Sequence, residues 1–218
     1  MDAILHELHT FFSEYKTAKY KKREIMLRPD DTPSCVFYLL KGYVRLYALS
    51  EAGEELTLII FLPGDVFPLN FILGNIVNKY YLEALGAVEV KKIPPLDFSD
   101  FVHKNPQILF KIISKVLIRF TGVLERMEYL VFGNSYQKVA SILFICAQRF
   151  GVKKNDEILI QVPLTHKDIG LIVGLTRETV SIEVKKLERK KLIRYLGRLI
   201  AVENLEKLKT ESLLTPSK

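Results

Sequence analysis

The chain has 218 residues, and 49% of them are hydrophobic, enough to fill the core of one large domain or two small ones. A disordered or collagen-like chain is therefore excluded. The formal net charge is +7, and the excess is clustered, because positions 176–198 hold eight basic and three acidic residues. Such a cluster indicates a polyanionic partner, although a solvated helix face would show the same composition.

The cysteines and histidines give little support to disulfide or metal chemistry. Cys35 and Cys146 lie in apolar segments far apart in the sequence, which favours buried free thiols in a reducing compartment. The sequence has no cysteine quartet for an iron–sulfur cluster or a zinc ion, and its histidines show no ligand-like spacing beyond His6 and His9. We therefore expect no metal and no other cofactor.

The first residues and the apolar runs bear on location and reaction class. The start MDAILHELHTFF carries acids and histidines where a signal peptide needs a basic start, and no apolar run approaches ~20 residues. The sequence thus predicts a soluble cytoplasmic protein with no membrane partner. It has neither a phosphate-binding glycine loop nor a nucleophile elbow, so we do not expect an enzyme.

From about Tyr20 to Pro95 the sequence has a β pattern. The runs CVFYLL, YVRLYAL, LTLIIFL and AVEVKKI are separated by turn signals at 41–42, 52–53 and 63–64. This pattern predicts an antiparallel barrel or roll. The clearest hairpin is GYVRLYALSEAGEELTLIIF, in which Gly53 can take a positive φ at the turn.

The segment NPQILFKIISKVLIRFTGVLERMEYLVF predicts one long helix. Asn105 can cap it, and Pro106 suits the first helical position, where its missing N–H costs nothing. Seven apolar residues follow at alternating spacings of 4 and 3, a mean of 3.5 that keeps one seam facing a partner helix. The seam residues are Leu109, Ile113, Val116, Phe120, Val123, Met127 and Leu130.

Two interpretations of this helix are open. Apolar residues also flank the seam, so the whole helix could be buried within one chain. Alternatively, one edge packs on the helix's own β-domain while the seam meets a second subunit. The strict spacing and Gly122 favour this second interpretation, a symmetric homodimer. The flanking apolar residues are Phe110, Ile112, Leu117 and Leu124.

Gly133 and Asn134 interrupt the helical pattern, and we predict a hinge at these two residues. Asn134 with Gln137 gives a capping-box-like start to a second helix, SYQKVASILFICAQRF, which Gly151 ends. We therefore place a domain boundary near residues 131–134.

The segment PLTHKDIGLIVGLTRETVSIEVKKLERKK predicts two helices joined by a sharp turn. Thr165 can cap the first helix, whose N3 residue is Asp168, and Gly174 lets the chain turn. Thr176 then caps a second helix over 176–191, which has a buried stripe and polar outer faces. The stripe is Val180, Val184 and Leu187, and the outer residues are Arg177, Glu178, Ser181, Ile182 and Lys185.

Two short strands around Gly197 follow, with Arg194 and Arg198 available for phosphates. A helix-turn-helix with such a hairpin is a winged helix, whose second helix can enter a major groove with its N-terminus first. Double-stranded DNA is therefore the expected partner. The rival is a signal-sensing module of a larger complex, whose basic helix contacts an acidic protein surface.

The whole chain resembles the cyclic-AMP-receptor/fumarate-nitrate-regulator family of bacterial transcription factors. The resemblance is carried by IGLIVGLTRETVS, KGYVRLYALSEAGEELTL, PGDVF and NPQIL. It implies an α+β fold: a cyclic-nucleotide-binding-like β-roll of jelly-roll type at 1–104, a dimerisation helix with its hinge at 105–133, and a winged helix-turn-helix at 134–218. It also implies a homodimer that reads a palindromic operator, responds to an effector in the roll and works with RNA polymerase.

The resemblance assigns roles to the second helix of the helix-turn-helix. Arg177 and Glu178 would reach base edges or adjoining phosphates, since arginine can donate to guanine and glutamate can accept from cytosine N4. Alternatively, Glu178 only interacts favourably with the helix dipole in the first turn. Ser181 would be a third contact. At Ile182 the family usually has an arginine, so this isoleucine either touches a thymine methyl or is simply exposed. The expected phosphate contacts are Thr165, Lys167, Thr176, Lys185 and Arg198.

The expected effector pocket departs from the family pattern. Cyclic-nucleotide binders have a glycine and a glutamate, then an arginine and a small hydroxyl residue, where this chain reads VFPLNFILGNIVNKYYLEAL. A buried cyclic phosphate needs a paired charge and the ribose needs a carboxylate, and neither is evident. We do not expect cyclic AMP to bind. Two alternatives stay open, namely that the pocket takes another, more apolar ligand or that it takes no ligand at all. The expected pocket residues are Gly64, Asp65, Leu69, Tyr80 and Tyr81.

Overall fold

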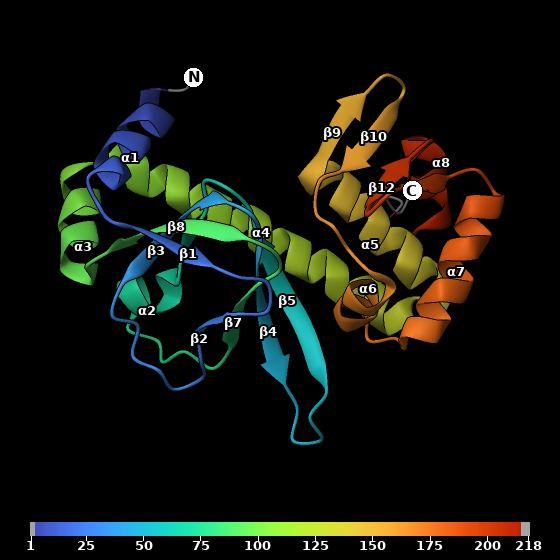
Figure 1. The fold of residues 1–218 in the computed structure, drawn as a ribbon, viewed down its shortest axis with the longest axis horizontal. Helices are drawn as coiled ribbons and strands as arrows, with labels where there is room; N and C mark the ends of the chain where they lie inside the picture. The colour runs from blue at the N-terminus through green and yellow to red at the C-terminus, as the bar shows by residue number, and fades with distance from the viewer. Residues whose placement is uncertain (1–2, 215–218) are drawn as a thin grey trace. The chain divides into compact units, whose positions relative to one another are not determined.

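The computed structural model describes residues 3–214, and by its backbone contacts the chain divides into Met1–Phe120 (unit 1) and Thr121–Lys218 (unit 2). The domain limits expected from the sequence, at 104/105 and 133/134, stay a prediction. Their outermost parts, residues 1–2 and 215–218, lie outside the described residues, as does the side chain of His6. The described chain combines helices with antiparallel sheets, which confirms the α+β class (Figure 1).

Unit 1 is a β-roll made of two four-stranded antiparallel sheets. Sheet A has the strand order β1-β8-β3-β6, and sheet B has the order β2-β7-β4-β5. The two sheets enclose a core of buried apolar side chains that includes Leu39 and Val90 from sheet A and Val44 and Leu82 from sheet B. The strands are β1 (Thr17–Tyr20), β2 (Ile25–Leu27), β3 (Val36–Lys41), β4 (Val44–Leu49), β5 (Glu55–Phe61), β6 (Val66–Phe67), β7 (Tyr81–Ala84) and β8 (Val88–Ile93).

The predicted hairpin is confirmed as β4 paired with β5. Gly53 has a φ of +79° at its turn, which a side chain would disfavour. Gly42, which joins β3 to β4, has a φ of +86°, and a Cβ added there would lie 2.3 Å from the carbonyl oxygen of Ala87. These two glycines let strands β3, β4 and β5 follow one another closely in the roll.

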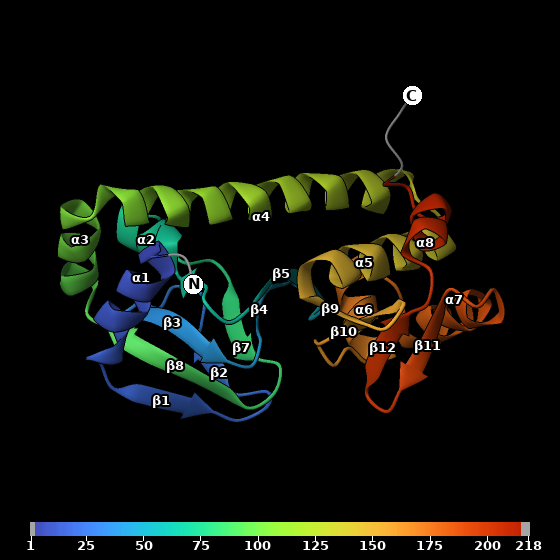
Figure 2. The same ribbon diagram turned by 90° about the horizontal axis from the view of Figure 1, so that it is seen from above.

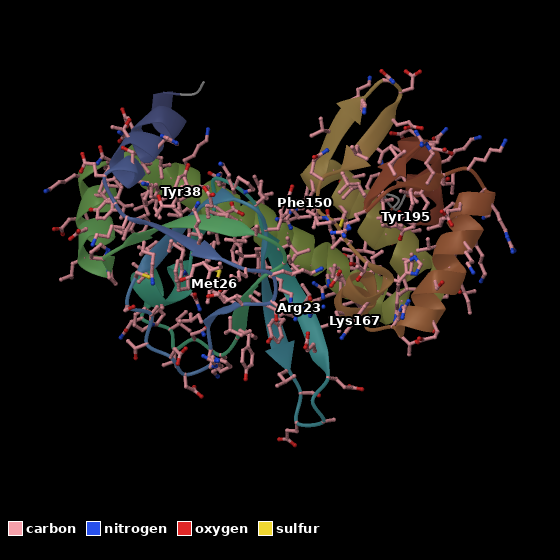
Figure 3. The ribbon with its side chains drawn as sticks, in the orientation of Figure 1. Arg23, Met26, Tyr38, Phe150, Lys167 and Tyr195 are labelled. Carbon is pink, nitrogen blue, oxygen red and sulfur yellow. The ribbon has the colours of Figure 1, made fainter. Side chains whose placement is uncertain are left out.

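Helices cover the other face of sheet A. Tyr38 of β3 points to that face and stacks on Phe12 with ring centroids 4.1 Å apart (Figure 3). Phe98, Ile108 and Ile112 complete this second core. The helices of unit 1 are α1 (Ala3–Ser13), α2 (Leu69–Gly74), α3 (Pro95–Lys104) and the first part of α4 (Pro106–Phe132), which is one continuous helix in Figure 2.

A buried charge cluster lies on the face of sheet B opposite the core. Arg45 of β4 lies opposite Glu83 of β7, and the residue pairs on either side of them face the core. Because side chains alternate along a strand, Arg45 and Glu83 point away from the core. The guanidinium is 2% exposed and donates to Glu83 from Nε at 3.0 Å and to Glu55 from Nη2 at 2.6 Å. It also lies 4.1 Å from the ring centroid of Tyr47. These carboxylates compensate a charge that has lost its water.

Unit 2 is built around helix α5 and a four-stranded sheet of order β11-β12-β10-β9. The capping box of Asn134 and Gln137 is confirmed, with Asn134 Oδ1 accepting from the backbone N–H of Gln137 at 2.9 Å. Its elements are α5 (Ser135–Phe150), β9 (Gly151–Lys154), β10 (Glu157–Ile160), α6 (His166–Val173), α7 (Arg177–Arg189), β11 (Ile193–Leu196), β12 (Leu199–Val202) and α8 (Leu205–Glu211).

Cys35 and Cys146 are buried free thiols, as predicted. Within residues 3–214 no helix is both long and apolar enough to cross a membrane, and no group of three or more metal-ligating side chains comes together.

Replacing Arg45 with alanine should lower the free energy of unfolding by up to about 3–5 kcal/mol, because the buried Glu83 would keep only the more distant Arg23, 3.7 Å away, to compensate its charge. Urea unfolding followed by circular dichroism measures this change. The matched control is Lys41→Ala, since Lys41 is exposed and lies 3.7 Å from Glu89. That exposed pair should contribute no more than about 1 kcal/mol. Equal losses in the two variants would contradict the assignment of Arg45 to a buried pair.

Candidate functional site

Helix α6 begins at a capping box that its sequence encodes. Thr165 Oγ1 accepts from the backbone N–H of Asp168 at 3.2 Å, and the Asp168 carboxylate accepts from the backbone N–H of Thr165 at 2.9 Å. Ile169 and Ile172 are buried against the rest of unit 2. The box leaves both capping side chains at the surface while it fixes where the helix starts.

Two glycines set the turn between α6 and α7 for different reasons. Gly174 has a φ of +66°, a left-handed conformation that ends α6. Gly170 is needed for space, because a Cβ there would lie 2.5 Å from the carbonyl oxygen of Leu175. Its own carbonyl accepts from the N–H of Leu175 at 3.1 Å. This close approach holds the start of α7 against α6.

Helix α7 separates a buried face from an outer face as predicted. Thr176 caps it by accepting from the N–H of Thr179 at 3.2 Å. Glu183 is also buried, 2.8 Å from Lys186, which the sequence reasoning did not predict. The buried stripe is Val180, Val184 and Leu187, whereas Arg177, Glu178, Ser181, Ile182 and Lys185 are exposed or half-exposed, with Ile182 at 56%.

The expected phosphate contacts all lie at the surface of unit 2. Lys167, labelled in Figure 3, is in the first turn of α6, and Lys185 is on the outer face of α7. Arg198 follows Gly197, whose φ is +62°, in the tight turn between β11 and β12. The hairpin predicted as a wing is therefore present, with an exposed cation near its tip. Thr165 and Thr176 occupy the two cap positions already described.

The sequence predicted that Arg194 of the wing is available for phosphates, but the structure pairs it with carboxylates. Its guanidinium donates to Glu157 of β10 at 2.9 and 2.7 Å and lies 3.4 Å from Glu203. The hydrogen bond from Arg194 lowers the pKa of Glu157, so this carboxylate stays ionised. Arg194 ties the wing to the rest of the sheet and is already engaged within unit 2.

Sequence reasoning did not single out His166 and Tyr195. His166 is the first residue of α6, and Tyr195 lies on β11 of the wing (Figure 3). Their ring centroids are 5.8 Å apart in an edge-to-face arrangement. Burial lowers the pKa of His166, and the nearby Arg177 and Lys185 act in the same direction. No spacing rule links residues 166 and 195; only the folded wing brings them together.

Helix α4 continues into unit 2 and contacts the helix-turn-helix there. Arg126 is buried, and its Nη2 donates to the carbonyl oxygen of Ile172, in the last turn of α6, at 2.7 Å. A cation at this end of a helix is favourable because backbone carbonyls point toward it. At the expected hinge, the N–H of Gly133 donates to Tyr129 at 3.0 Å and Asn134 caps α5.

Within residues 3–214, the seam of α4 is largely exposed. Ile113, Phe120 and Met127 are 41%, 58% and 57% exposed, although each is large and apolar. The buried side of the helix lies one residue away, at Ile108 and Ile112. Burial of the whole helix within one chain is therefore not what the structure shows. Val116 is also exposed, and Leu109, Val123 and Leu130 are half-buried.

The expected effector pocket is only partly assembled. Gly64 and Leu69 line a cavity of about 10 Å³, room for about one water molecule. Asp65 is buried and lies 3.2 Å from Arg119 of α4. Tyr80 and Tyr81 do not line this cavity, and Tyr81 instead stacks on Tyr47 of β4. The remaining lining residues are Leu8, Val66, Lys111, Ile112, Lys115 and Arg119.

Comparison with known proteins agrees with this architecture. Residues 17–105 match the family model of the cyclic nucleotide-binding domain, and residues 137–211 match that of the Crp-like helix-turn-helix domain. The chain is 29% identical to the global nitrogen regulator of Nostoc sp. over 84% of its own length and 83% of that protein. It is 27% identical to the cAMP-activated global transcriptional regulator CRP of Salmonella typhimurium, over 89% and 93% of the two chains.

A solved structure supports the fold over nearly the whole chain. The structure of a CooA mutant from Carboxydothermus hydrogenoformans has a TM-score of 0.78 and 22% identity, and the match covers 96% of each chain. The two matched domains follow one another in this order, with the long helix between them. They define a DNA-binding transcriptional regulator whose β-roll is of the effector-binding type. The chain belongs to the cyclic-AMP-receptor/fumarate-nitrate-regulator family.

Proposed function

We propose that the protein works as a homodimer that reads a palindromic operator through the outer face of α7. The observation that carries the proposal is the composition of this face. Arg177, Glu178 and Ser181 are accessible at its N-terminal end, while the opposite face is anchored in unit 2 by buried aliphatic side chains. An α-helix with such an end can enter the major groove, where donors and acceptors distinguish base pairs.

Each outer residue has a role that its chemistry allows. Arg177 donates to guanine, Glu178 accepts from cytosine, and Ser181 can do either. Ile182 contacts a thymine methyl, so the operator departs from the family's usual half-site at this step. Thr165, Lys167, Thr176, Lys185 and Arg198 contact phosphates, which position the domain without selecting sequence.

The exposed seam supports the dimer. Seven apolar side chains at a mean spacing of 3.5 residues line one face of α4, and four of them, Ile113, Val116, Phe120 and Met127, are exposed in the described part of the chain. A second copy of the same helix covers them, because a two-fold axis brings identical stripes together. The same axis places the two α7 helices on successive half-sites. We also propose that the protein works in the cytoplasm and that RNA polymerase is a further partner.

We further propose that the effector is not a cyclic nucleotide. The two arginines of unit 1 that are almost wholly buried, Arg45 and Arg119, already face carboxylates. Asn78, near the position where such binders have their arginine, donates to the carbonyl oxygens of Arg28 and Tyr80, at 2.7 Å each. A buried cyclic phosphate would have to displace one of these partners, which leaves a carboxylate or carbonyl unpaired.

Phe120→Glu should convert the dimer into a monomer, because two like charges would enter an apolar interface at a cost of several kcal/mol. Sedimentation at micromolar concentration measures the change. The matched control is Ile118→Glu, since Ile118 is 68% exposed and lies off the seam; this variant should remain a dimer. A monomeric unmutated protein would remove the basis for two-fold reading.

Cyclic AMP and cyclic GMP should produce no binding heat in titration calorimetry at micromolar protein, because the buried Arg45 and Arg119 already face carboxylates and are not available for the phosphate. The Salmonella regulator, which is described as cAMP-activated, provides the positive control under the same conditions. Micromolar affinity for either nucleotide would show that the Leu69–Tyr81 segment has been misassigned.

Arg177→Ala and Lys185→Ala should weaken DNA binding in different ways. On an operator selected from random duplexes, Arg177→Ala should cost about 1–3 kcal/mol and relax the choice of one base per half-site. Lys185→Ala should weaken all duplexes about equally and reduce the salt dependence by about one phosphate per subunit.

Ile182→Arg is the complementary test, since the added arginine should shift preference toward a guanine at a nearby step. If neither Arg177→Ala nor Ile182→Arg changes the selected sequence, α7 is not the reading helix. Weak binding that does not depend on salt or sequence would instead favour the acidic-protein partner.

A further inference from the structure

His166 occupies a junction of the three elements that form the exposed basic surface of unit 2. It is the first residue of α6, between Thr165 and Lys167. Its ring lies edge-to-face on Tyr195 of the wing, with centroids 5.8 Å apart. On the third side, Arg177 and Lys185 of α7 are close enough to act on its charge. Expected phosphate contacts therefore flank this half-buried imidazole.

The groups around His166 keep the ring neutral in the free protein. Its pKa is lowered first by burial and then by Arg177, and Lys185 acts in the same direction. Glu188 of α7 opposes them but does not reverse the net direction. The charged neighbours on its own element are Lys167 and Asp168, of which Asp168 is held in the capping box.

Tyr195 does not titrate alongside the histidine. Burial raises the pKa of its hydroxyl to about 12, and Glu188 adds to this increase. At neutral pH the tyrosine is therefore protonated and neutral. Among the groups that face one another here, His166 is the one whose charge can change near physiological pH.

DNA would reverse the electrostatic environment of this ring. Phosphates attracted to Lys167, Arg177 and Lys185 would stand in the same region as His166 and would neutralise the cations that disfavour its charged form. A protonated imidazole can then donate a charge-assisted hydrogen bond to a phosphate oxygen.

We propose that His166 is a further phosphate contact of the DNA-binding face and that it takes up a proton when duplex DNA binds. The proposal rests on the proposed DNA-binding role of α7. The proton comes from solvent, and the neutral imidazole becomes an imidazolium in the complex. DNA affinity is thereby linked to pH through a residue outside the base-reading set.

The sign of the pH dependence follows from the two protonation states. The pKa of His166 lies below its ordinary value of 6.5 in the free protein, and in the proposed complex it would be higher. Affinity is highest below this window, falls as pH rises through it, and is constant above it. Each unit by which the pKa rises on binding corresponds to about a tenfold gain in affinity per subunit.

The test measures binding of a fluorescent duplex of fixed mixed sequence to the full-length protein, from about pH 5.5 to about pH 8, where histidine titrates. A non-operator duplex suffices, because phosphate contacts do not depend on sequence. The variants are His166→Gln, which cannot be protonated, and His166→Arg, which is always charged. His103→Gln is the matched control, since His103 lies on α3 in unit 1 with its Nδ1 2.7 Å from the carbonyl oxygen of Ser99.

We expect the affinity of the unmutated protein and of His103→Gln to fall with rising pH by about tenfold per subunit for each unit of pKa change. His166→Gln should bind weakly throughout with a flattened profile. His166→Arg should bind near pH 8 as tightly as the unmutated protein binds near pH 5.5. This rescue separates a charge effect from a loss of folding.

Two results would overturn the proposal. One is a flat profile in the unmutated protein, and the other is the same slope in His166→Gln as in the unmutated protein. Both leave DNA binding itself intact. Absence of salt-dependent duplex binding at every pH would instead overturn the proposed function, and this inference with it.

Discussion

Helix α4 has to satisfy two apolar stripes at once, and the rest of the structure depends on this constraint. Ile108 and Ile112 pack into the second core of unit 1, while the seam one residue further along is uncovered. A helix turns about 100° per residue, so adjacent stripes face clearly different directions. The chain can therefore bury one stripe in its own fold and offer the other to a second copy without distorting the helix.

Cations on the inner side of α4 hold it in place in both units. Lys115 donates to the carbonyl oxygen of Gly64 at 2.8 Å, and Arg119 pairs with Asp65, the residue that follows Gly64. Further along the helix, Arg126 donates to Ile172 of α6. The Gly64 turn borders the small cavity of unit 1, and Ile172 belongs to the helix-turn-helix. The first part of α4 thus makes specific polar contacts within unit 1, and its last part makes one with the helix-turn-helix of unit 2.

Much of this organisation could be predicted from local sequence because it rests on local chemistry. The capping boxes at Asn134 and Thr165 need only residues three apart, and the left-handed turn at Gly174 needs only a glycine. The buried stripe of α7 follows from helical period alone. These features were confirmed where the sequence placed them.

Features that depend on tertiary pairing could not be predicted in this way. Ile108 and Leu109 are both apolar, and only the packed roll decides that Ile108 is buried. The Arg45–Glu83 pair requires the register of β4 against β7, and the Arg194–Glu157 pair requires the wing to lie beside β10. Sequence spacing does not contain these registers, because each joins residues more than thirty positions apart.

The ion pairs within unit 2 also limit how its surface can select DNA. Arg194 is taken up by Glu157, and Lys190 by Glu211 at 2.8 Å, so neither adds freely to the field that attracts phosphates. The remaining positions supply affinity but little discrimination. In the proposed docking, the side chain of Ile182 can form no hydrogen bond, so base selection would fall to few polar side chains and to the deformability of the duplex. Under the proposed reading by α7, so few reading groups would need two half-sites for specificity, and the seam of α4 would then be as necessary to recognition as α7 itself.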